Sequence, residues 1–531
     1  MGKKAEKLKH LNDELLAIGL SLTSEHNFDI LMEKIMLSAK KFTNADAGTV
    51  YVMSDDKKRL SFKVVHTDSL DIKMGGTGEE LNWPDLQLYL ESGEPNKQMV
   101  AALCALDGKL LNFPDVYDAV GFNFEGTKAF DSSTGYRSRS MLVVPMTDRE
   151  DNVIGVLQLL NKIGSEGDVA PFSMHDEVLI SSMGSLAAVA IQNNLLIKNL
   201  EDLLEAFITA IAEALEEKSI YTEHHIMRVA EIVKMISEAV NKDNKEFEKI
   251  HYSKEQLKEL EIAAMLHDIG KIITPEYVVD KATRLETIVD RIEMISRRFE
   301  LLKRDRYIDY LENILNLQND AEKQQFYDKY QQSIKEISDD KEFLIGCNTA
   351  GYLSDDKIER IKEIGKQKII LDGNEIDFLS ENEIYNLTIQ KGTLTNEERE
   401  IINNHVTVSY HMLQHLPFPE KYKNIPKLAG SHHKSVDGKG GYSAPELVGI
   451  PLEFEEKILA VADVFEALTS PERPYKKPFT LNESFRIMFN MVKEGHLDKS
   501  IIKFILDNNL HMKFAKKYLN ESQIDEVEVT I

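Results

Sequence analysis

Apolar positions in the N-terminal third change period in the way expected of a mixed α/β domain. Helical spacing comes first, in Leu11, Leu15, Ile18 and Leu22, and a second helix is expected from about Asp29 to Lys41. Strand-like stretches follow: GTVYVM, LSFKVV, SMLVVPM and VIGVLQLL. The last two are separated by TDREDN, a polar turn suited to a hairpin. A final helix is expected from near Ser173, so residues 1–196 are predicted to form a small α/β sensor domain.

After about Asn193 the pattern becomes helical. Apolar residues separated by steps of three and four form a seam like that of a short coiled coil: Ile197, Leu200, Leu204, Phe207 and Ile211. Two interpretations of this connector, residues 197–218, remain open. It is either a helix packed on the next domain or a helix that transmits the state of the sensor within a parallel homodimer.

Composition and charge narrow the class of protein. The chain has 531 residues, enough for two or three domains, and its 42% hydrophobic and 29% charged residues are typical of globular proteins. The formal net charge of -25 argues against binding to a nucleic-acid polymer, but it allows a small nucleotide in a locally basic pocket. Cys104 and Cys347 form no CxxC motif. With no signal sequence and no apolar run approaching about 18 residues, we expect a soluble cytoplasmic protein without a membrane span.

The main chemical feature is the doublet His267-Asp268 in LHDIGK. On a helix an Asp can bridge two ions while the adjacent His binds one, and Gly270 supports a helix stop directly after the doublet. Further potential ligands are scattered far along the chain: His225, His405, His432, His433 and Asp463. Scattered His and Asp residues of this kind are typical of a dinuclear hydrolytic site.

Local patterns orient several of these residues. His225 shares a helical face with Val229, Ile232 and Val233, so it is expected to point inward. Asp463 interrupts an apolar helix, and a buried carboxylate requires a partner such as a metal ion. The helix carrying His405 is expected to open at TNEE, where Thr395 and Glu398 suit a capping box.

The ordered motifs resemble the HD-GYP phosphodiesterases, all-helical members of the HD hydrolase superfamily that open cyclic di-GMP. The resemblance covers residues 205–531 and rests on YTxxHxxRV, LHDIGK, His405, HHxxxDG, ADVFEALT, RPYK and the tail motif GHLD. It implies metal ligands at His225, His267, Asp268, His405, His432, His433 and Asp463, with Asp268 bridging two ions. It also implies substrate contacts at Lys271, Tyr442, Arg473 and Lys476, with Asp268 and Lys271 as catalytic residues. Ligands without thiolate suit iron, manganese or another first-row divalent ion.

The chain departs from the family pattern at several places. Tyr221 stands where some members carry a Glu that recruits a third metal, so we expect two ions. Lys434 replaces an acid, and the expected GYP reads GKGGYS, with an extra glycine and Ser443 in place of Pro. Finally, an insertion at about 285–394 is charged and mostly helical in pattern, as in a long-insert subgroup of the family.

The N-terminal third resembles a GAF domain. The run NKIGSEGDVAPFSMHDE matches the NKFDE pattern of GAF domains in cyclic-nucleotide phosphodiesterases and cyclases, at Asn161, Lys162, Phe172, Asp176 and Glu177. Lys162 and Asp176 are expected to pair and hold the last strand against the last helix. The resemblance implies either a cyclic nucleotide as ligand or a domain that only dimerises.

Together these features predict a GAF-regulated, metal-dependent phosphodiesterase that hydrolyses cyclic di-GMP to pGpG and, in a further step, GMP. The altered GKGGYS loop leaves open the same chemistry on a cyclic GMP-AMP dinucleotide. A weakly active signalling protein that docks diguanylate cyclases is a third interpretation, and an HD phosphohydrolase of mononucleotides is a fourth.

Overall fold

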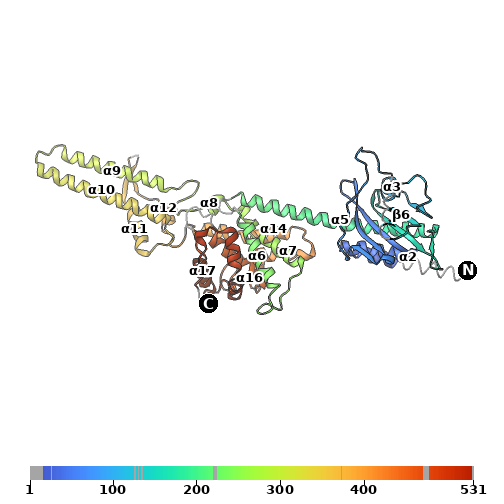
Figure 1. Cartoon of the computed structure of the whole chain (residues 1–531). Coiled ribbons are helices and arrows are strands. Elements are labelled where there is room, and N and C mark those ends of the chain that lie inside the picture. Colours follow the sequence, from blue (N-terminus) through green and yellow to red (C-terminus); the bar gives the residue numbers. More distant parts are fainter. Residues whose placement is uncertain are drawn as a thin grey trace. The chain divides into compact units, whose positions relative to one another are not determined.

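The computed structural model describes residues 16–25, 27–97, 99–122, 124, 127–128, 131–132, 135–218, 224–371, 373–470 and 478–528. The chain divides into two compact units, Met1–Leu204 and Glu205–Ile531, here called the N-terminal and C-terminal units. The first is mixed α/β and the second is largely helical (Figure 1), so the predicted fold class is confirmed.

The N-terminal unit is an antiparallel sheet with helices. Its elements in chain order are α2 (Phe28–Thr43), β1 (Ala45–Met53), β2 (Arg59–Thr67), η1 (Asp68–Leu70), β3 (Ile72–Gly75), β4 (Leu86–Gln87), α3 (Val100–Asp107), β5 (Leu111–Phe113), β6 (Met141–Thr147), β7 (Val153–Ile163), β8 (Val169–Ala170) and α5 (Met174–Glu216). The long strands β1, β2, β6 and β7 match the predicted stretches, and β6 and β7 form the expected hairpin. The short strands β3, β4, β5 and β8 were not predicted.

The sheet has the strand order β3-β2-β1-β7-β6-β5, with β4 beside β2 and β8 beside β7. Apolar residues of α2 and α5, such as Ile35 and Met183, share a core with Val50 and Leu157 of the sheet. A second core, which includes Tyr51 and Phe113, joins other strand residues to Cys104 of α3. Helices therefore cover both faces of the sheet because its strands carry apolar residues on both sides.

Helix α5 runs without a break from Met174 to Glu216 and joins the predicted last sensor helix to the predicted connector. Lys162 Nζ pairs with the Asp176 carboxylate at its start, as predicted, and Asp176 Oδ2 also accepts a hydrogen bond of 2.6 Å from the Ser173 amide. Leu200 and Phe207 are more than half exposed, whereas Ile208 is buried. The connector therefore has an exposed seam followed by a segment packed on the C-terminal unit.

By length and composition α5 could cross a membrane, with a mean hydropathy of 1.3 over an 18-residue window, and it is the single such helix among the described residues. Of that window 39% is buried, and Ile180, Met183 and Ile191 of α5 lie in the first core of the N-terminal unit. This average includes small and polar residues between apolar ones, so it differs from the unbroken apolar run considered for the sequence. The absence of a membrane span stays a prediction.

The C-terminal unit consists mainly of helices. Its elements are α6 (His225–Val240), α7 (Lys254–Leu266), η2 (Ile269–Ile273), α8 (Glu276–Val279), α9 (Ile292–Ile314), α10 (Asp320–Thr349), α11 (Asp355–Gly365), β9 (Lys368–Leu371), β10 (Asn374–Asp377), α12 (Glu381–Leu387), α13 (Asn396–Asn403), α14 (His405–Gln414), η3 (Glu420–Tyr422), α15 (Ile425–Ser431), η4 (Pro445–Leu447), α16 (Phe454–Thr469), α17 (Leu481–Lys493), α18 (Lys499–Asp507), α19 (Leu510–Tyr518) and η5 (Glu521–Gln523). The capping box of Thr395 and Glu398 is present at the start of α13, as predicted.

The insertion at about 285–394 is mostly helical, as predicted, and has a core of its own. Helices α9 and α10 lie side by side as an antiparallel pair (Figure 1). Phe299 of α9, Leu344 of α10 and Ile361 of α11 are at most 1% exposed and belong to one cluster with Phe378. The two-stranded hairpin of β9 and β10 within the insertion was not predicted. The insertion therefore packs as a helical layer rather than as an unstructured loop.

Candidate metal centre

His267 and Asp268 lie at the end of α7, where the sequence placed them. His267 is the C-cap of α7 and is fully buried, and Asp268 is 2% exposed between α7 and η2. The helix ends here because η2 passes directly against α14: a Cβ on Gly270 would lie only 2.0 Å from the carbonyl oxygen of His405. The Gly270 amide also donates a hydrogen bond of 2.9 Å to Ser409 Oγ. This close approach brings His405 to Asp268.

The two carboxylate oxygens of Asp268 face two different groups of imidazoles. Oδ2 lies 3.3 Å from His267 Nε2 and 3.7 Å from His225 Nε2. Oδ1 lies 3.1 Å from His405 Nε2 and 3.9 Å from His432 Nε2. Asp268 therefore stands between two ligand groups, which is the arrangement that a bridging carboxylate requires.

Asp463 joins the same two groups from α16. Its Oδ1 lies 3.5 Å from His225 Nε2, and its Oδ2 lies 3.8 Å from His433 Nδ1. Three sets of side chains among the described residues bring ligand atoms close enough to hold an ion: His225 with His267 and Asp268; His405 with His432 and His433; His267 with His432 and Asp463. The structure thus gathers all seven residues proposed as ligands, from α6, α14, α16 and the ends of α7 and α15.

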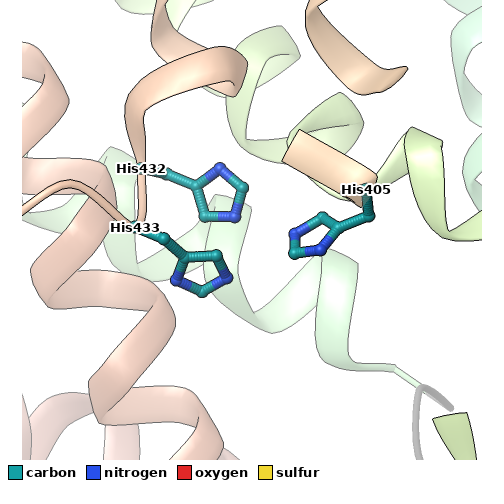
Figure 2. A group of neighbouring side chains, drawn as sticks. All are labelled: His405, His432 and His433. Atoms are coloured by element: carbon teal, nitrogen blue, oxygen red, sulfur yellow. The ribbon is translucent and has the colours of Figure 1, made fainter. Parts of the chain in front are cut away.

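Several polar atoms at the centre of this cluster are buried without a hydrogen-bond partner. They are Nε2 of His267, His405 and His432, and Oδ1 of Asp268. In each of the three imidazoles Nδ1 is held by a backbone carbonyl, that of Ala264, Ile402 or Ala429, at 2.5–2.7 Å. This fixes a tautomer whose Nε2 lone pair points inward. Figure 2 shows the rings of His405, His432 and His433 turned toward a common space. Because unpartnered buried polar atoms are costly, their convergence fits a cation.

Burial and neighbouring charges together shift the pKa values of the clustered residues. Burial, followed by the charge of His433, holds the pKa of His432 well below its usual range. Burial and then His405 do the same for the pKa of His433. Burial is the largest influence on the pKa of His267 and lowers it, but Asp268, Asp463 and the Ala264 carbonyl together raise it, so the net direction is upward. Burial raises the pKa of Asp268. Lys271, His267 and His405 act in the opposite direction, and together they hold this pKa well below its usual range.

The structure corrects one local prediction. The helix that opens at Thr395 ends at Asn403, and His405 is the first residue of the separate helix α14. Asn404 forms the turn between them, and the carbonyl of Ile402 is used by the His405 ring. This break lets His405 face Asp268 across the Gly270 contact.

Glu466 and Arg228 are buried partners of the cluster that sequence reasoning missed. The Glu466 carboxylate accepts a hydrogen bond from His225 Nδ1, and its Oε1 lies 2.6 Å from Arg228 Nε. Glu466 thereby directs Nε2 of His225 toward Asp268 and Asp463. A signal was available, because Glu466 follows Asp463 by three residues and Arg228 follows His225 by three, so each pair shares a helix face.

The residues predicted to contact substrate are only partly described. Lys271 Nζ lies 2.5 Å from Asp268 Oδ2. Burial lowers the pKa of Lys271, but the carboxylates of Asp268, Asp463 and Glu466 together raise it by more. The Tyr442 ring packs on His433 at 4.7 Å between centroids, and burial raises the pKa of its hydroxyl. Arg473, Lys476 and Tyr221 lie outside the described residues. Lys271 and Tyr442 therefore border the cluster.

The altered loop after His433 has a defined structure. Lys434 Nζ donates hydrogen bonds to the carbonyls of Leu447, at 2.7 Å, and Ile450. Gly441 has a φ of 71°, and a Cβ there would lie 2.2 Å from the carbonyl oxygen of His433. Ser435 Oγ lies 2.8 Å from His496 Nδ1, so the tail motif GHLD supports this loop. These residues thus build a folded turn beside His433.

In the N-terminal unit the residues of the predicted sensor motif make hydrogen bonds and core contacts that hold the domain together. Asn161 Oδ1 accepts a hydrogen bond of 2.7 Å from the Arg139 amide, Glu177 accepts one of 2.7 Å from Asn112, and Phe172 is buried in the core. None of the five motif residues lines the cavity of about 220 Å³ in this unit. That cavity has aromatic walls formed by Tyr51, Phe62, Trp83 and Phe124.

Comparison with protein families identifies both units. A GAF domain model matches residues 27–191, and two HD domain models match residues 222–340 and 382–501. The chain therefore has a GAF domain followed by an HD region, and the seven clustered residues lie within the matched HD segments.

Two curated relatives are phosphodiesterases. The 3'3'-cGAMP-specific phosphodiesterase 1 of Vibrio cholerae is 36% identical over 118 residues, which are 22% of this chain and 26% of the relative. The dual 3',5'-cyclic-AMP and -GMP phosphodiesterase 11 of Drosophila melanogaster is 28% identical over 235 residues, 42% of this chain and 15% of the relative. The chain thus spans about a quarter or less of each relative. Among solved structures, a GAF domain/HD domain protein from Geobacter sulfurreducens has a TM-score of 0.23 and 17% identity, covering 33% of this chain and 97% of that one.

Proposed function

We propose that this chain is a metal-dependent phosphodiesterase of cyclic dinucleotides, with cyclic di-GMP as its first substrate. The observation that carries the proposal is the position of Asp268, whose two oxygens face separate imidazole groups around buried, unpartnered ligand atoms. Two divalent cations in such a cluster would activate water and neutralise phosphate charge. Nitrogen and oxygen ligands without thiolate favour iron, manganese or another first-row ion.

The roles proposed for the residues follow from their contacts. His225, His267, Asp268 and Asp463 form one ligand group, and Asp268 with His405, His432 and His433 forms the other. Lys271 is a protonated group that borders the cluster and pairs with Asp268. With cations bound to the Asp268 carboxylate, the Lys271 ammonium would be available to contact a non-bridging oxygen of the substrate phosphate. The raised pKa of Tyr442 keeps its hydroxyl protonated and able to donate to substrate.

A substrate comparison tests the proposal. Anaerobically purified full-length protein of measured metal content is incubated with cyclic di-GMP, 3'3'-cyclic GMP-AMP and cyclic GMP, and the products are separated by chromatography. We expect linear dinucleotide from cyclic di-GMP, and no product in the presence of a chelator. Absence of hydrolysis of any phosphodiester by metal-replete protein would overturn the assignment.

A second candidate substrate is 3'3'-cyclic GMP-AMP. The turn from Lys434 to Tyr442 departs from the family pattern beside His433, and the relative from Vibrio cholerae is named for this dinucleotide. A higher kcat/KM for cyclic GMP-AMP than for cyclic di-GMP in the same assay would select it.

For the GAF domain we propose a cyclic mononucleotide as ligand. The cavity of about 220 Å³ combines aromatic walls with the N-terminus of α3 at Met99, Val100 and Ala101, where free amides favour a phosphate. His66 also lines it and is 2% exposed, and its ring makes no hydrogen bond to any residue that the structure describes. Aromatic walls suit a purine ring.

Calorimetric titration of the full-length chain with cyclic AMP and cyclic GMP tests this ligand class. We expect binding of at least one of them, weakened about tenfold or more by Trp83→Ala, which removes part of the aromatic wall. Adenosine and guanosine are the matched controls without phosphate and should bind more weakly. No heat with either cyclic nucleotide would favour a domain that only dimerises.

A further inference from the structure

The last turn of α5 contacts the helix that begins with His225. Glu216 Oε1 accepts hydrogen bonds from the amides of Ile226 at 3.1 Å and Met227 at 3.4 Å. These amides belong to the first turn of α6, which has no earlier carbonyls in its own helix to bond. A carboxylate at this position is also favoured by the helix dipole. Glu216 therefore fixes the start of the helix that presents His225.

Two residues further on, Lys218 contacts the opposite end of another short helix. Its Nζ donates hydrogen bonds to the carbonyls of Lys271 at 2.8 Å, Thr274 at 2.7 Å and Ile272. These carbonyls lie at the C-terminal end of η2, where a cation is favoured. An ammonium group has three donors, and all of them are used here. Lys218 therefore fixes the segment that carries Lys271.

The last turns of α5 pack firmly within the C-terminal unit. Ile208, Ala212 and Leu215 of α5 are 2%, 1% and 5% exposed. Leu215 and Lys218 line a small cavity of about 10 Å³ together with Asp268 and Lys271. A displacement at the end of α5 would thus act directly on the walls around Asp268.

We propose that Glu216 and Lys218 are positioning residues, which hold the start of the His225 helix and the segment carrying Lys271 in place beside Asp268. The inference rests on the proposed function, because it assigns two supporting residues to that same site.

Hydrogen–deuterium exchange of the full-length protein tests the positions of the backbone without any substrate. In Lys218→Met, amide exchange over residues 269–275 should be about tenfold faster, and in Glu216→Ala, which removes the acceptor, the same should hold for residues 225–230. Lys218→Arg retains donors for the carbonyls and should restore slow exchange. Glu217→Ala, an exposed neighbour between the two, is the matched control and should leave both segments unchanged.

Kinetics supply the second readout. Lys218→Met should lower kcat about ten- to a hundredfold through misplacement of Lys271, while metal content and the thermal midpoint stay close to wild type. Unchanged exchange in both variants of an active enzyme would overturn the positioning role. An equal loss of protection throughout the C-terminal unit would also overturn it, because that result indicates general destabilisation. If the wild-type chain hydrolyses no cyclic dinucleotide, the proposed function fails, whereas the exchange result still decides the positioning role.

Discussion

Asp268→Asn is expected to lower phosphodiesterase activity by about 10³-fold or more. Asparagine has nearly the same shape but carries no charge and has only one oxygen. Its amide nitrogen would have to face either the His267 and His225 side or the His405 and His432 side of the cluster. One ligand group would then lose its shared carboxylate oxygen. Metal content per chain should fall together with kcat, as measured by elemental analysis and by initial rates with cyclic di-GMP.

The matched control for this variant is Asp507→Asn. Asp507 is an exposed residue at the end of α18 in the same unit, so the identical chemical change should leave metal content and activity unaltered. Full activity in Asp268→Asn would refute a mechanism that depends on two bridged ions. A folded variant with reduced metal content and no activity would support it.

Gly270→Ala is expected to destabilise the C-terminal unit by about 3 kcal/mol or more, at the upper end of the range for overpacked sites. The added Cβ would lie 2.0 Å from the carbonyl oxygen of His405 and 2.7 Å from the amide nitrogen of Ser409. Both are backbone atoms of α14, so the clash is not relieved by rotating a side chain. Helix α14 would have to move away from η2 and take His405 with it. We therefore expect a lower thermal midpoint together with weaker metal retention, measured by calorimetry and by dialysis against chelator.

Gly346→Ala supplies the opposite control. Gly346 lies in helix α10, and a Cβ there would meet no heavy atom within 4 Å. The same substitution should therefore be neutral or stabilise the chain by up to about 1 kcal/mol, because alanine favours helix more than glycine does. If Gly270→Ala behaved like Gly346→Ala, the close contact between η2 and α14 would not exist in solution.

Much of the fold follows from local sequence pattern. The four long strands of the GAF sheet, the hairpin between β6 and β7, and the capping box of α13 were all predicted, because each depends on residues close together in the chain. Strands of two to four residues, such as β4 and β8, carry too few alternating positions to be recognised. The hairpin of β9 and β10 was missed for the same reason, since each strand has four residues.

The candidate site was predicted as a set of residues but not as a geometry. The histidines and aspartates are separated by long stretches, and no spacing in the sequence indicates that Oδ1 and Oδ2 of Asp268 face different imidazole groups. The pairing of Glu466 with His225 joins α16 to α6, and helix periodicity alone does not reveal which helices are neighbours. The roles of Arg473 and Lys476 remain predictions from the resemblance.

By itself the sequence determined the order of a mixed α/β domain and a helical unit, the identity of the buried His and Asp residues, and the place of His267 and Asp268 after a helix. Periodicity, capping and unusual buried polar residues are local properties. Tertiary structure alone decided which ligands share an oxygen of Asp268, that Gly270 must pass against α14, that Glu216 bonds the first turn of the His225 helix, and that Lys218 bonds the carbonyl of Lys271. These features depend on contacts between segments distant in the chain, and packing brings such segments together only when the whole core forms.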